Sequence, residues 1–95
     1  MEDKRKKIEQ AVCDFYKVEP QEIYATRKSV FPYDVCKKVL MYHLFKNKVR
    51  EYDIAPMFGV STRIVSKNIC EIKEAMKSET KVREDIEIIY SMLNE

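Results

Sequence analysis

The chain has 95 residues, of which 45% are hydrophobic and 36% charged, and 18 Lys or Arg against 16 Asp or Glu give it a formal net charge of +2. This composition indicates one soluble globular domain with a single core, because a disordered chain needs fewer apolar residues and more net charge. It excludes a transmembrane helix, since no apolar run approaches the length of about 20 residues that a bilayer requires. One glycine and three prolines among many Glu, Lys, Ile and Met residues favour helices.

The N-terminal part of the sequence predicts two helices. Its opening letters MEDKRKK are charged and no apolar block follows them, so we expect no secretory signal and a cytoplasmic location. Residues 2–17 predict a helix because Ile8, Val12 and Phe15 recur at helical spacing and form one apolar stripe. A short helix follows, in which Pro20 occupies the first turn, where its missing N–H costs nothing.

The middle of the sequence predicts a loop, a long helix and a second short helix. Residues 25–31 form the loop, which a proline closes. Residues 32–46 form the long helix, and its wide apolar face consists of Val35, Val39, Tyr42 and either Leu44 or Phe45. Residues 50–58 form the short helix, which turns Ile54 and Phe58 inward.

The C-terminal part predicts a corner and two amphipathic helices. Gly59 supplies the corner because glycine accepts positive φ without a clash, and Ser61 is placed as the N-cap of a helix over residues 61–77. The inward stripe of this helix consists of Val65, Ile69, Ile72 and Met76. A final helix over residues 79–93 repeats that spacing with Val82, Ile86, Ile89 and Leu93. Five or six short helices and no convincing strand predict a compact all-α bundle.

The sequence lacks the usual patterns for catalysis, cofactors and metals. His43 is the only histidine and lies within the long predicted helix, where a packed or surface side chain is the usual case. One glycine in the chain makes both GxxxxGK[ST] and GxGxxG impossible. Cys13, Cys36 and Cys70 form no CxxC pair, so each is expected to be a small apolar filler. We therefore expect no enzyme activity, no cofactor and no metal.

Positive charge is concentrated in one part of the chain. Residues 25–50 contain seven Lys or Arg against one acid, a net charge of +6. Residues 61–70 add +2 without any acid, whereas residues 71–95 carry −3. Local clustering of this kind is expected of a surface that contacts phosphate, although an ordinary solvated surface also produces it.

The segment YDIAPMFGVSTRIVSKNI, residues 52–69, is typical of a helix-turn-helix, whose second helix enters the major groove with its first residues facing base edges. With the apolar stripe inward, the outward face carries the candidate DNA-binding residues Ser61, Thr62, Arg63, Ser66 and Lys67, together with Cys70. Arg63 could bind a guanine edge through its two-donor fork. Thr62 and Ser66 could bond bases or phosphates, and Lys67 could pair with phosphate.

The chain resembles the C-terminal DNA-binding domain of the bacterial replication initiator DnaA, a Trp-repressor-like helix-turn-helix. The family's R-Q-I-A-M-Y-L corresponds to KKVLMYHL, residues 37–44. Its S-x-x-E-I-G-x-x-F-G-G-R-D-H-T-T-V-x-x-A corresponds to REYDIAPMFGVSTRIVSKN, residues 50–68. The order of the other elements also agrees, so the resemblance spans residues 8–93. It implies this fold, double-stranded DNA as the partner, and a role in replication initiation or its regulation.

The resemblance also places the residues of a second DNA contact. The family's minor-groove arginine falls on Ser29, and Arg27 and Lys28 stand just before it. The loop at 26–29 is therefore expected to touch the adjacent backbone or minor groove. Further phosphate contacts are expected from Lys37, Lys46, Lys48 and Arg50. Lys37 replaces a family arginine, which keeps the charge and loses the fork.

The chain departs from the family in the letters that read bases. Ser61, Thr62, Arg63 and Ile64 stand where the family has D-H-T-T. This difference predicts another DNA target or weaker specificity. The sequence thus favours sequence-specific or semi-specific DNA binding without ATPase activity. The alternative is a protein-interaction module that kept the fold and lost DNA binding, with an acidic partner surface on the last helix formed by Glu84, Asp85 and Glu87.

Overall fold

The computed structural model describes residues 2–25 and 33–93, and these residues form helices joined by short turns. The helices are α1 (Glu2–Tyr16), α2 (Pro20–Ala25), α3 (Tyr33–Lys46), α4 (Glu51–Phe58), α5 (Thr62–Ser78) and α6 (Thr80–Leu93). No strand occurs in the described ranges, so the prediction of a compact all-α bundle is confirmed. Their ends lie within one residue of those expected from the sequence.

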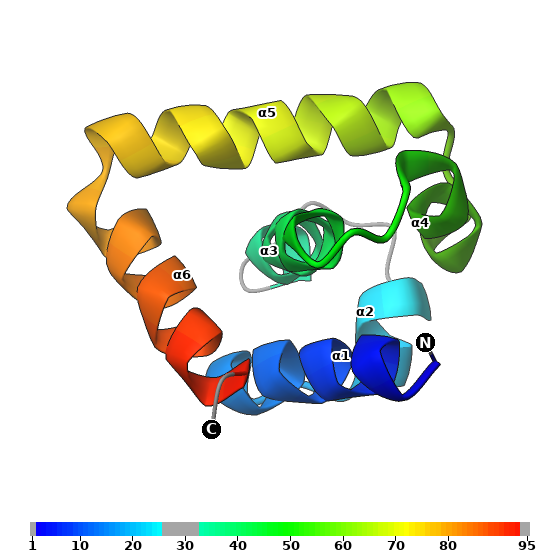
Figure 1. The fold of residues 1–95 in the computed structure, drawn as a ribbon, viewed down its shortest axis with the longest axis horizontal. Helices are drawn as coiled ribbons and strands as arrows, with labels where there is room; N and C mark the ends of the chain where they lie inside the picture. Colours follow the sequence, from blue (N-terminus) through cyan, green and yellow to red (C-terminus); the bar gives the residue numbers. More distant parts are fainter. Residues whose placement is uncertain (1, 26–32, 94–95) are drawn as a thin grey trace.

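Helix α3 is the centre of the bundle. Figure 1 looks along its axis and shows α5, α6, α1 and α4 arranged around it. The residues from Val39 to Leu44 are consecutive and all buried, so the second half of α3 is enclosed on every side. The sequence predicted a wide apolar face, and in the second half of α3 the structure extends burial around the helix, because other helices pack against it on several sides.

The histidine of α3, His43, is among the buried residues of this helix. His43 is 1% exposed, and its Nε2 atom has no hydrogen-bond partner. Burial lowers the pKa of His43 to about 4, because a charged imidazolium would lose its hydration there. The imidazole is therefore neutral near pH 7 and packs edge-on against Tyr42, with a centroid distance of 5.6 Å. Of the packed and surface positions that the sequence left open for this histidine, the structure shows the packed one.

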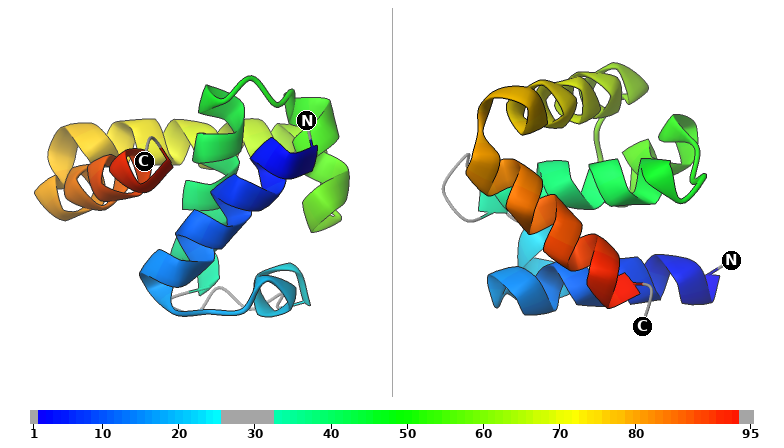
Figure 2. Two further views of the ribbon diagram at one scale, coloured as in Figure 1. Left: turned by 60° about the horizontal axis from the view of Figure 1, so that its bottom comes forward. Right: turned by 60° about the vertical axis from the view of Figure 1, so that its left-hand side comes forward.

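The outer helices bury the stripes that their sequences predicted. Ile8 and Val12 of α1 are buried, as are Ile86 and Ile89 of α6, and Phe15 packs at the edge of the same core. The two views of Figure 2 show α6 crossing from the end of α5 back toward α1. The core thus joins α1 to both α3 and α6, and α6 also packs on α5. No helix in the described ranges is long and apolar enough to span a bilayer.

The sequence suggested Asp85 as part of an exposed acidic surface for a protein partner. The structure contradicts this, because Asp85 is buried. The side chain is 12% exposed, and its carboxylate lies close to the Tyr16 hydroxyl of α1. Burial and then this negative charge raise the pKa of Tyr16 above its ordinary value of 10. Lys81 reaches the same carboxylate at 3.4 Å from the solvent side. Glu84 and Glu87 remain exposed.

The cysteines divide into two groups. Cys13 and Cys36 are buried apolar fillers as predicted, and burial raises the pKa of these thiols to about 11 and about 12. Both therefore stay protonated and unreactive near pH 7. Cys70 is exposed on α5, so its expected role as a core filler is wrong. Cys70 lies outside the buried stripe of Val65, Ile69 and Ile72, on the outward face that the helical spacing also predicted for it.

Candidate nucleic-acid interface

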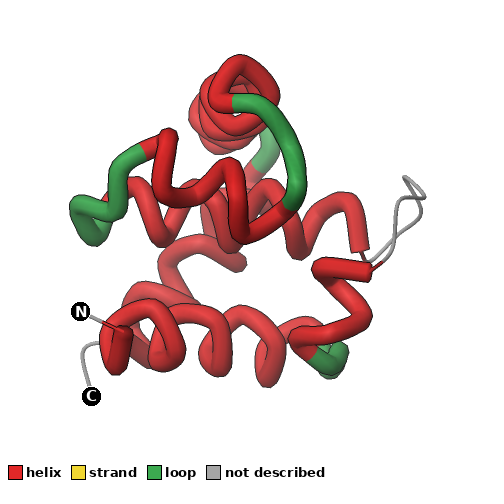
Figure 3. The backbone as a smooth tube through the Cα atoms, turned by 90° about the vertical axis from the view of Figure 1, so that its right-hand side faces the viewer, coloured by secondary structure: helices red, strands yellow, loops and turns green. Residues whose placement is uncertain are grey.

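The connection from α4 to α5 consists of three residues, Gly59, Val60 and Ser61. Gly59 adopts the left-handed conformation (φ 65°, ψ 35°), and its N–H bonds back to the Pro56 carbonyl. The Val60 N–H bonds to the Ala55 carbonyl at 3.1 Å, which completes a Schellman-type helix end. The predicted corner at Gly59 is confirmed. It sends the chain directly into α5, which Figure 3 shows nearly end-on.

The first turn of α5 presents exposed side chains of mixed chemistry. Ser61 caps the helix as predicted, because its Oγ accepts a hydrogen bond from the Ile64 N–H at 3.4 Å. Thr62 and Arg63 are exposed, and Ile64 is 43% exposed although it is apolar. This turn contains no acid. A hydroxyl, a guanidinium and a branched apolar group thus stand together at the positive end of the helix dipole.

Ser66 does not face outward with Arg63, and the sequence-based assignment of Ser66 to the outward face is wrong. Its hydroxyl donates a hydrogen bond to Glu51 Oε2 in the first turn of α4, and the side chain is half-buried. Ser66 therefore fastens α5 to α4. This contact has a physical cause: Ser66 follows the buried Val65, and the start of α4 packs against that edge of α5.

Positive charge dominates the outward face of α5 over its first half. Lys67 is exposed there, as predicted. The first acid of α5, Glu71, forms an ion pair with Lys38 of α3, with 2.8 Å between Oε2 and Nζ. This hydrogen-bonded pair lowers the pKa of Glu71 and offsets its charge. Glu51 borders the same region, where it accepts the Ser66 hydroxyl.

The other predicted phosphate contacts occupy two places. Lys48 and Arg50 are exposed in the loop between α3 and α4, where Lys48 adopts a positive φ of 70°. Arg50 donates a hydrogen bond to the Tyr52 hydroxyl and lies 5.7 Å from the centre of its ring. Lys46 is exposed at the end of α3, and Lys37 lies half-buried earlier in the same helix. Arg27, Lys28 and Ser29 lie outside the described residues.

Two interactions of the interface were not predicted from the sequence. The Glu51–Ser66 hydrogen bond and the Lys38–Glu71 ion pair each join helices that are adjacent only in the fold. Helical periodicity locates a face of one helix, whereas such pairs depend on the crossing of two helices. The exposure of Ile64 was also not predicted, although its position outside the apolar stripe of α5 indicated it.

No family model, no curated protein and no solved structure matches the chain. The resemblance to the DnaA domain therefore stays a prediction, and the function must be argued from the side chains themselves. The arrangement offers a capped helix end that carries hydrogen-bond donors and one apolar group, and two further cations lie on the loop before α4.

Proposed function

We propose that the protein binds double-stranded DNA in a sequence-specific or semi-specific way, with α4 and α5 acting as a helix-turn-helix. The observation that carries this proposal is the exposed, acid-free first turn of α5, which Ser61 caps directly after the glycine corner. A three-residue turn containing glycine is usual for this motif, and its second helix meets base edges with its N-terminal residues. The helix dipole adds attraction for the phosphates that flank the groove.

Each exposed side chain of this turn suits a feature of DNA. The Arg63 guanidinium can donate two hydrogen bonds to the O6 and N7 atoms of guanine. The Ile64 side chain can contact a thymine methyl group, and Lys67 can pair with a phosphate one turn further along the helix. Ser66 is not a reader in this proposal, because Glu51 holds its hydroxyl.

The resemblance to the initiator domain supports a role in replication initiation or its regulation. A single glycine leaves no phosphate-binding loop of either usual type in this sequence, so the proposed role is DNA recognition without ATP hydrolysis. Ser61, Thr62, Arg63 and Ile64 replace the family's reading letters. The proposed target sequence therefore differs from that of the initiator family.

Replacing Arg63 by Ala is expected to remove the preference at one base pair. A bidentate arginine–guanine contact discriminates by about 1–3 kcal/mol, so the change corresponds to roughly 5- to 150-fold at that position. Selection from a random duplex library identifies the preferred sequence. Titrations of the preferred duplex and of duplexes with single changes then measure the preference for each variant.

Lys67→Ala is the matched control, because it removes one exposed positive charge from the same helix. If Lys67 contacts phosphate, its loss weakens binding to every duplex by a similar factor and lowers the salt slope by about 1. The base preference stays as in the parent protein. Identical preferences in the parent and Arg63→Ala proteins would remove Arg63 from the reading role.

A second function has one observation in its favour. Ile88 and Tyr90 of α6 are 49% and 60% exposed, and two large side chains on one exposed stretch of helix could contact a protein partner. In this alternative the chain keeps the fold without binding DNA. The absence of binding to all duplexes at low salt would favour it over DNA recognition.

A further inference from the structure

A basic pocket lies between the first helix and the loop that leads into α4. Its volume is about 400 Å³, and it is bounded by Lys4 and Arg5 of α1 and by residues 47–50 and 53. Four of these residues are cations, and Asp53 is the one acid among the described residues that line the pocket. Like charges gather here from parts of the sequence more than forty residues apart. Nothing in the core requires this, because these side chains lie at the surface.

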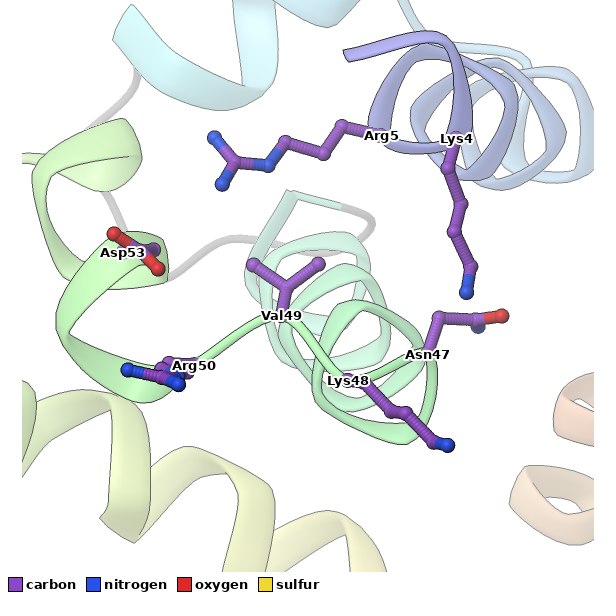
Figure 4. Close-up of a pocket in the computed structure, with 7 residues that line it drawn as sticks. All are labelled: Lys4, Arg5, Asn47, Lys48, Val49, Arg50 and Asp53. Atoms are coloured by element: carbon purple, nitrogen blue, oxygen red, sulfur yellow. The ribbon is translucent and has the colours of Figure 1, made fainter. Parts of the chain in front are cut away.

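Lys4 and Arg5 reach over the pocket from α1, whereas Lys48 and Arg50 stand at its rim on the loop (Figure 4). Lys4 extends from α1 toward the Asn47 amide, and Arg5 extends across the opening on the side of Asp53. Lys48 and Arg50 leave the loop in opposite directions, and Val49 lies between the two walls. Ammonium, guanidinium and amide groups are all hydrogen-bond donors, so the pocket suits an anion with several acceptor oxygens.

The pocket is close to the proposed reading helix. Arg50 directly precedes Glu51, whose carboxylate accepts the hydroxyl of Ser66 on α5. In Figure 3 the loop between α3 and α4 and the start of α1 lie one below the other on one edge, with α5 above them. A duplex whose groove receives the first turn of α5 has its phosphate backbone beside that groove. This backbone must also reach the pocket for a phosphate to bind there.

We propose that this pocket holds a phosphate of the DNA backbone, with Lys4 and Arg5 of α1 as donors and with Lys48 and Arg50 adding positive charge at its rim. The inference rests on the proposed function and adds the first helix to the DNA-binding surface. Arginine presents a planar fork to two phosphate oxygens, and lysine supplies a compact charge. Asp53 opposes the phosphate and limits the affinity of the pocket.

The test compares two double variants with the same loss of charge on the same helix. Lys4→Ala/Arg5→Ala removes two pocket donors, whereas Lys6→Ala/Lys7→Ala removes two exposed cations that do not line the pocket. Binding to one duplex is measured at several salt concentrations. The pocket variant is expected to bind more weakly, with a salt slope smaller by about 0.9 for each phosphate that it no longer neutralises. The control variant should keep a slope close to that of the parent protein.

Asp53→Asn is expected to change the affinity for DNA in the opposite direction, because it removes an acid from the pocket and leaves every cation in place. Loss of this acid should tighten binding to the same duplex and steepen the salt dependence. Circular dichroism and thermal unfolding verify that each variant is folded. Equal slopes for the two double variants, together with unchanged binding by Asp53→Asn, would overturn the pocket while leaving DNA binding intact. If the parent protein binds no duplex, the proposed function is wrong, and this inference, which rests on it, is wrong as well.

Discussion

Lowering the pH from 7 to 5 is expected to reduce the free energy of unfolding by about 2 kcal/mol through His43 alone. The cause is its burial in the enclosed half of α3, which lowers the pKa of the imidazole from 6.5 to about 4 in the folded protein. The unfolded chain binds a proton as the pH falls below 6.5, whereas the folded protein does not until about 4. Stability is therefore fully present above pH 6.5 and declines as the pH falls toward 4.

Urea unfolding at several pH values measures this dependence, and His43→Leu is the matched variant. It removes the titrating group and the unpartnered Nε2 atom together, so its stability should change much less between pH 7 and pH 5. Because the chain has one histidine, a single imidazole resonance reports its protonation by NMR. That resonance should keep its neutral position down to pH 5. A titration midpoint near 6.5 in the folded protein would contradict the buried, neutral histidine.

The histidine also shows how far the sequence could predict the fold. Helical spacing in α1, α5 and α6 identified the stripes that are buried, because each of these helices covers the core with one face. Gly59 and Ser61 were predictable for a local reason, since one accepts positive φ and the other caps a helix. The enclosure of α3 was not predictable from periodicity, because it results from the arrangement of four other helices.

The candidate interface was less predictable than the fold. The exposure of Thr62, Arg63 and Lys67 followed from their distance around the helix from the apolar stripe. Ser66 and Asp85 were assigned to the surface, although one bonds to α4 and the other lies against Tyr16 of α1. Polar residues beside a buried stripe can face solvent or a neighbouring helix, and only the crossing of the two helices decides between these outcomes.

The position of α5 on the surface also depends on how a neighbouring helix packs. Helix α4 has only eight residues, so its own hydrogen bonds cannot hold it in place. Ile54 and Ala55 dock it on the core, and Glu51 joins it to Ser66. The Phe58 ring adds a contact with Tyr24 of α2, at a centroid distance of 5.1 Å, although Phe58 itself is only partly buried. The geometry of the proposed reading turn therefore depends on the packing of α4.

Ile54→Ala is expected to destabilise the protein by about 2–5 kcal/mol, the range for truncating a buried aliphatic side chain. The Ile54 side chain is 0% exposed, so its removal leaves a cavity beneath α4. Part of the effect should be local, because α4 loses most of its attachment to the core. We therefore expect faster hydrogen exchange in α4, and weaker DNA binding even at temperatures where the variant is folded. Urea unfolding and amide exchange measure the two effects separately.

Ile88→Ala is the control, since it makes the same change at a position on α6 that is 49% exposed. Its expected cost is below about 1 kcal/mol, because no cavity forms. DNA binding by this variant should equal that of the parent protein if α5 is the reading element. Comparable destabilisation by the two substitutions would contradict the packing of α4. Weaker DNA binding by Ile88→Ala alone would instead place the interface on α6, because the exposed side of that helix is far from the first turn of α5 in Figure 1.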